Sequence, residues 1–192
     1  RDRVVFALNP QVHACDDATI VENVGSLRSV AETLRGFAGG ATLGISPVTL
    51  RYRVDPRPLS SRVPGERPFT ADPRQATPFA AAWMLAFLAA AAEAGFASLT
   101  FFELLGPRGV MDAGEAFPVL RALADVTALP GGFVVPARSR RPERVQALVL
   151  RANGRCRVFV ANVTGDPHPV RVDGLKGRAR RAALGEASPG AD

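Results

Sequence analysis

The chain has 192 residues, of which 47% are hydrophobic and 22% are charged, so we expect one sizeable globular domain, with or without a smaller neighbour. The net charge of +6 comes from scattered arginines without a nucleic-acid-binding motif, which argues against a nucleic-acid partner. The longest uncharged apolar run, 79–92, is shorter than the roughly 20 residues that cross a bilayer. Cys15 and Cys156 are too far apart for a disulfide framework, and reduced thiols in the cytoplasm are the simpler expectation.

Strand and helix patterns alternate along the first part of the chain. Residues 4–8 form a continuous apolar run that predicts a buried strand. From Asp17, the expected N-cap, apolar positions recur at steps of three and four and predict an amphipathic helix. The pattern then repeats twice. The expected strands cover 4–8, 42–50 and 97–103, and the expected helices cover 17–39, 78–94 and 114–128.

This alternation indicates parallel strands covered by helices, either in a doubly wound sheet or in part of a (β/α)8 barrel. Polar or turn-forming residues end each strand, at 9–13, at 46–53 and at Glu103, and the carboxyl ends of barrel strands form the active-site face. No GxGxxG or P-loop motif follows a strand, which weakens the nucleotide-binding alternative. We therefore predict an α/β chain with about three β/α units from the C-terminal part of a (β/α)8 barrel.

After Pro130 the helical period gives way to β patterns. The hairpin signal Asn153-Gly154 separates two of the expected strands, which cover 132–135, 145–151, 156–162 and 170–172. We predict a partial barrel over 1–130 and a small, truncated antiparallel β-sandwich-like domain over 131–192, with a frayed tail from Gly185. Because three units cannot close a barrel, we expect a fragment of a longer protein, which would be unstable alone with its strand edges exposed.

Two residues are candidates for catalysis. Glu103 ends an apolar strand, where low-dielectric surroundings would raise a carboxylate pKa and make it a usable general base or acid. His13 follows the first strand, and its imidazole could transfer a proton or hold a substrate hydroxyl. The structural alternatives are a salt bridge or loop cap for Glu103 and a helix cap for His13.

Four further side chains are candidates for substrate binding. Asn9 and Gln11 offer amides for hydroxyls or an oxyanion, although both could instead satisfy loop backbone groups. Arg74 and Gln75 end a long, arginine-rich loop, and a guanidinium would suit a sugar-acid carboxylate. His13, Asp16 or Asp17 could ligate a metal together with Glu103, yet no HxH, HExxH or DxD spacing is present. We expect no metal and no cofactor.

Several segments resemble the D-apionate lactonase family of bacterial sugar catabolism. The resemblance rests on the stretches "ALNPQVHACDD", "ISPVTLR", "ADPRQATPFAAAWMLAFLAAAAEAG" and "SLTFFELLGPRGV". It covers about residues 3–130, and the β module fits the family's C-terminal domain more loosely. The resemblance implies a glycosidase-like (β/α)8 barrel with a β domain that hydrolyses D-apionolactone to D-apionate. It places six candidates on the family's motif positions: Asn9, Gln11, His13, Arg74, Gln75 and Glu103.

Lactone chemistry suggests a mechanism for these residues. Glu103 or His13 would take a proton from water, which attacks the lactone carbonyl, while Asn9, Gln11 or Arg74 stabilises the oxyanion. The expected partner is a small sugar lactone or sugar acid, and the oligomeric state stays open. One alternative is a glycoside hydrolase, in which Glu103 would work with a second carboxylate. Another is a noncatalytic carbohydrate-binding protein.

Overall fold

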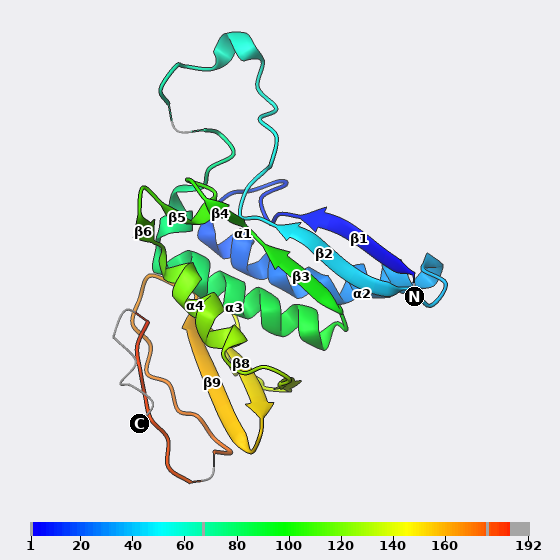
Figure 1. Cartoon of the computed structure of the whole chain (residues 1–192), viewed down its shortest axis with the longest axis vertical. Coiled ribbons are helices and arrows are strands. Elements are labelled where there is room, and N and C mark those ends of the chain that lie inside the picture. The colour runs from blue at the N-terminus through cyan, green and yellow to red at the C-terminus, as the bar shows by residue number, and fades with distance from the viewer. Residues whose placement is uncertain (1, 67, 176, 185–192) are drawn as a thin grey trace.

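A three-stranded parallel sheet forms the N-terminal half of the protein (Figure 1). The computed structural model describes residues 2–66, 68–175 and 177–184. Strands β1 (Arg3–Leu8), β2 (Thr42–Val48) and β3 (Ser98–Phe101) lie side by side in chain order. Phe6 and Leu8 pack toward the helices, whereas Val5, on the opposite face, is 46% exposed. The predicted parallel pairing of these strands is confirmed.

The first predicted helix is divided into three pieces. They are α1 (Asp17–Glu22), the 3-10 helix η1 (Asn23–Ser26) and α2 (Leu27–Phe37). Within η1, the Ser26 hydroxyl donates to the Asn23 carbonyl at 2.7 Å, a local bond that competes with the α-helical pattern. The expected cap was wrong by one residue, because Asp16 is the N-cap and accepts a hydrogen bond from the Thr19 amide at 2.9 Å.

Helix α3 (Pro78–Glu93) is buried on nearly all sides. It follows the short 3-10 helices η2 (Leu59–Ser61) and η3 (Pro73–Ala76). Trp83 is fully buried, and its indole Nε1 donates to the Ile20 carbonyl at 3.2 Å. In Figure 1, α3 lies between the parallel sheet and the C-terminal sheet. Among the described helices, none has the combination of length and apolarity that a membrane span requires.

A small sheet that the sequence did not predict follows β3. It consists of β4 (Glu103–Leu105), β5 (Gly109–Asp112) and β6 (Glu115–Ala116). The third helix therefore begins later than expected, as α4 (Pro118–Thr127). Ala113 and Gly114 have φ values of 47° and 85°, which form the tight turn between β5 and β6 and exclude a right-handed helix there.

The C-terminal module is an antiparallel sheet of β7 (Phe133–Val135), β8 (Val145–Ala152) and β9 (Arg155–Asn162). The predicted hairpin is confirmed, since Asn153 and Gly154 both have positive φ. The strand expected over 170–172 is wrong, because this segment forms no strand ladder within the described residues. The frayed tail predicted from Gly185 lies outside the described residues.

Candidate active site

A small pocket of about 10 Å³, with room for about one water molecule, lies at the carboxyl ends of β2 and β3, where the predicted fold places an active site. It is formed by the segment after β2, the segment around η3 and the chain after β3. The lining residues are Thr49, Leu50, Arg51, Tyr52, Arg53, Thr70, Asp72, Gln75, Phe102, Glu103 and Arg108. Glu103 and Gln75, both predicted as site residues, therefore share this pocket.

Glu103 enters the pocket after a sharp change of backbone direction. The preceding residue, Phe102, is buried and has a φ of 57°, a left-handed conformation that is uncommon for a bulky residue and often marks a functional site. The Glu103 side chain is 44% exposed, in contrast to the buried position that the sequence suggested. Its carboxylate Oε1 lies 2.9 Å from Nη2 of Arg108.

Sequence reasoning missed Arg108. It follows Glu103 by five residues, in the turn Gly106-Pro107-Arg108-Gly109. The Gly-Pro pair is a turn signal, and a turn there brings the following residues back beside Glu103. The structure shows this, because Gly109 pairs with Glu103 in the parallel ladder of β4 and β5.

Asp72 organises a buried polar cluster beside the pocket. Gln11 Nε2 donates to Asp72 Oδ2 at 2.5 Å and to the Leu50 carbonyl at 2.6 Å. Arg74 binds the same carboxylate through Nε and Nη2, both at 2.8 Å, and its Nη1 donates to Asp17 at 2.6 Å. Burial raises the pKa of Asp72, but the hydrogen bonds from Arg74 and Gln11 outweigh it, so its pKa is lowered from the usual value.

The predicted substrate-binding side chains Gln11, Arg74 and Gln75 make their contacts within the protein. Gln75 is buried, and its Nε2 donates to the Gly109 carbonyl at 2.8 Å. Because these amide and guanidinium donors are directed at the protein itself, the contacts favour a structural role. Their role in substrate binding stays a prediction.

His13 and Asn9 lie on the loop after β1. His13 is exposed, and no hydrogen bond or ion pair within the described residues links it to Glu103. Asn9 is half-buried, and its Oδ1 accepts a hydrogen bond from the Gln11 amide at 3.1 Å. The structure therefore brings Glu103 and Gln75 into one pocket and leaves both His13 and Asn9 outside its lining, so the catalytic role of His13 and the binding role of Asn9 also stay predictions.

The long loop between β2 and η3 projects from the same end of the sheet (Figure 1). At its base, Tyr52 stacks with Phe69 at a centroid distance of 6.5 Å, and Arg51 lies over the Phe69 ring at 4.3 Å. Farther out, Arg57 binds Asp55 and Glu66 at 2.9 and 2.8 Å. Hydrogen bonding from Arg57 lowers the pKa of Asp55 to about 2. These contacts hold the two sides of the loop together.

The described residues contain no group of three or more His, Cys, Asp or Glu side chains that could hold a metal ion. His13 and Glu103, possible ligands by residue type, are accordingly not part of such a group.

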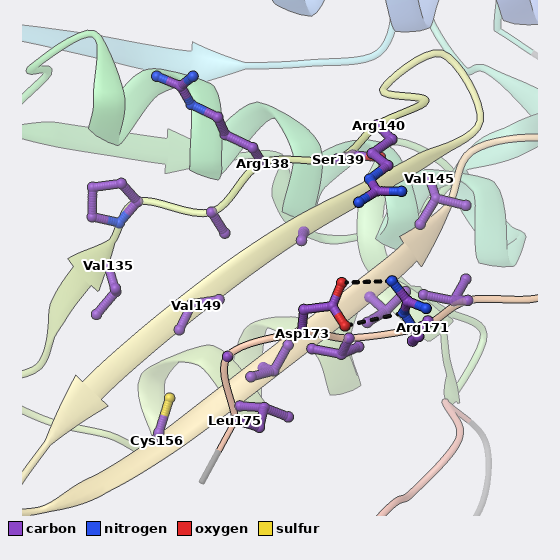
Figure 2. A pocket seen from close by; sticks show the side chains of 18 of the residues that line it. Val135, Arg138, Ser139, Arg140, Val145, Val149, Cys156, Arg171, Asp173 and Leu175 are labelled. Carbon is purple, nitrogen blue, oxygen red and sulfur yellow. Dashed lines mark hydrogen bonds and ion pairs between the residues drawn. The ribbon is translucent and has the colours of Figure 1, made fainter.

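A larger groove of about 1150 Å³ lies on the outer face of the C-terminal sheet. Figure 2 labels four of the residues that line it, Val135, Val149 and Cys156 of the sheet region and Leu175 of the segment after the sheet. An ion pair at 3.0 Å joins Arg171 and Asp173 beside the groove. None of the predicted site residues lines it, so its size alone does not make it the candidate active site.

Comparison with known proteins agrees with the predicted fold class. Residues 1–131 match the family model described as D-apionate lactonase, TIM barrel domain, and residues 142–192 match the C-terminal immunoglobulin-like domain of the same family. A D-apionate lactonase of Brucella anthropi is 29% identical over 185 residues, which cover 89% of this chain and 29% of the relative. The chain thus spans less than a third of that relative's length. The model of the barrel domain alone matches more than half of this chain, so the chain belongs to the D-apionate lactonase family.

Proposed function

We propose that this chain forms part of a hydrolase that opens a sugar-derived lactone, converting D-apionolactone to D-apionate. The observation that carries the proposal is the position of Glu103 at the carboxyl ends of parallel strands, among the polar side chains Asp72, Gln75 and Arg108. Family membership and the Brucella relative named D-apionate lactonase support the same reaction. The comparisons give no support to a glycoside hydrolase.

Glu103 acts as the general base in this proposal. Its carboxylate takes a proton from water as the water oxygen attacks the lactone carbonyl carbon. The resulting tetrahedral oxyanion collapses, the bond from the carbonyl carbon to the ring oxygen breaks, and the ring oxygen takes up a proton as the hydroxyl of the product acid. No covalent intermediate with the protein is needed. His13 is the alternative base.

Asn9 is the favoured candidate to bind the oxyanion. Its side-chain nitrogen donates no hydrogen bond to another described residue, whereas Gln11 and Arg74 donate to Asp72. An amide N–H directed at the developing negative charge would stabilise the transition state. We propose that the residues of this step lie in a barrel part over 1–130, and that 131–192 form the attached β domain.

The test is acid release by the full-length protein from D-apionolactone and from simple aldonolactones. Glu103→Gln removes the base but keeps the side-chain shape, so we expect a loss of about 10²- to 10⁴-fold in kcat. His13→Ala is measured beside it. The matched control is Glu143→Gln, which changes an exposed glutamate of the C-terminal module and should leave turnover unchanged.

Several outcomes would contradict the proposal. Full activity in Glu103→Gln with loss in His13→Ala would move the base to His13. A protein that binds the lactone without releasing acid would be a noncatalytic carbohydrate-binding protein. Cleavage of an aryl glycoside without lactone hydrolysis would refute the reaction itself.

A further inference from the structure

All three nitrogens of the Arg108 guanidinium bind neighbouring groups. Nη2 lies 2.9 Å from Oε1 of Glu103, and Nε donates to Oε2 of the same carboxylate at 3.3 Å. The two contacts form a side-on, two-point pair, which fixes the plane of a carboxylate more strictly than a single contact does. The third nitrogen, Nη1, donates to Thr70 Oγ1 at 3.3 Å and to the Arg53 carbonyl at 3.4 Å.

The turn that carries Arg108 is tightly built. Gly106 has a φ of 90°, and a Cβ on Gly109 would lie 2.8 Å from the Leu105 carbonyl carbon and 2.9 Å from that of Leu104. The Gly109 carbonyl is held by the buried Gln75 side chain at 2.8 Å. Because backbone contacts set the position of this turn, the Arg108 side chain starts from a fixed point beside Glu103.

Arg53 and Thr70 belong to the two ends of the long loop after β2. A hydrogen bond to each end from one nitrogen joins the base of the loop to the Arg108–Glu103 pair. One guanidinium thus connects the candidate general base with the two segments that border the pocket. An ammonium group is a point charge on a flexible stem and cannot reproduce the planar fork.

We propose that Arg108 is a positioning residue that holds the Glu103 carboxylate in the orientation needed to take a proton from water. This inference rests on the proposed lactone hydrolysis. A carboxylate has about four lone-pair sites, so a two-point pair leaves others for the water. Arg108 acts through Glu103 and has no contact with the substrate in this proposal.

The experiment measures kcat and KM of the full-length protein for lactone hydrolysis in Arg108→Lys and Arg108→Ala. We expect kcat to fall by about 10²-fold in both variants, the size of effect that a misplacement of about 1 Å produces, with KM changed less than about threefold. Millimolar guanidinium should restore part of kcat in Arg108→Ala, because it can reoccupy the vacated site, and should not do so in Arg108→Lys.

The matched control is Arg157→Lys. Arg157 and its partner Asp125 are exposed to nearly the same extents as Arg108 and Glu103, but they join β9 to α4. In this control variant, kcat and KM should both equal those of the unmodified protein. A rise in KM at constant kcat would overturn the proposal and make Arg108 a substrate-binding residue, and unchanged constants would overturn it as well. If the unmodified protein hydrolyses no lactone, that result refutes the proposed function, and the inference about Arg108 is refuted with it.

Discussion

At the scale of single residues, Asp72 and Gln11 together join three separate segments. Its carboxylate, 1% exposed, receives hydrogen bonds from Gln11 after β1 and from Arg74 before α3. Gln11 also binds the Leu50 carbonyl after β2. A buried carboxylate is stable only when such partners compensate for its lost hydration.

Replacing Asp72 with asparagine should therefore destabilise the protein. Arg74 and Gln11 would lose their charged acceptor, and breaking such a buried pair costs about 3 kcal/mol in the free energy of unfolding. Chemical denaturation of the full-length protein at pH 7 measures the change. The control, Asp173→Asn, removes an exposed partner of Arg171 and should change stability by less than about 0.5 kcal/mol.

The effect of Asp72 should also depend on pH. Its pKa is lowered in the folded state, so its stabilisation is fully present above the unfolded pKa of about 3.9 and is lost as pH falls through the folded pKa. The stability difference between the unmodified protein and Asp72→Asn should thus narrow in acid below about pH 4. A difference that stays constant down to pH 2 would contradict this account.

Residue types were easier to predict from the sequence than their partners. The concentration of polar side chains after β1 was visible in Asn9, Gln11 and His13. Whether an amide binds a ligand or a neighbouring segment depends on what folds against it, and Asp72 stands 61 residues from Gln11. No local pattern contains that information. Arg108 is a different case, because it stands only five residues from Glu103 and the turn signal Gly106-Pro107 lies between them.

At the scale of elements, the turn between β4 and β5 depends on a glycine. The backbone of Leu104 and Leu105 passes so close to Gly109 that a Cβ there would meet it at under 3 Å. Such a close approach cannot be relieved by rotating a side chain, since the neighbouring atoms are main-chain atoms.

Gly109→Ala should displace this turn and with it Arg108. We expect a lower melting temperature and a loss of lactone hydrolysis comparable to that of the Arg108 variants. Gly36→Ala is the control, since Gly36 lies in α2 and a Cβ there would meet nothing within 4 Å beyond the backbone of its own helix. Alanine in a helix is favoured over glycine by about 0.5–1 kcal/mol. Equal stability of the two variants would show that the turn can relax.

Long elements with clear periodicity were predictable, and short ones were not. The apolar run of α3 and the Asn153-Gly154 hairpin have strong local signals. Strands β4 to β6 are two to four residues long, and their sequences ELL, GVMD and EA show no sustained alternation of apolar and polar residues. The segment 170–172 does alternate, yet a strand also needs a neighbouring backbone to pair with.

At the scale of the whole molecule, the parallel sheet has two open edges. Strands β1 and β3 are the outer strands of the described sheet, and Val5 faces away from the helices. Unpaired edges of this kind favour pairing with other chains. The interior is nevertheless continuous on the side of the helices, where a single hydrophobic cluster contains residues of both sheets.

The 192-residue chain produced alone should therefore lack a single cooperative thermal transition. Circular dichroism and calorimetry across a range of protein concentrations would measure this, with association growing as concentration rises. The full-length protein is the reference. One sharp, concentration-independent transition in the isolated chain would show that its core is sufficient and that the open edges cost little.

Helix α3 also limits how the C-terminal sheet can move relative to the parallel sheet and its helices. Leu148 of β8 and Trp83 of α3 belong to one buried cluster, so buried apolar side chains join the C-terminal sheet to α3, in addition to the exposed Arg157–Asp125 pair between β9 and α4. Hinge motion between bodies requires a boundary that can open without exposing such side chains to water. The C-terminal sheet and α3 should therefore move together as one rigid body. Any opening and closing of the pocket during turnover should then come from the loops that border it.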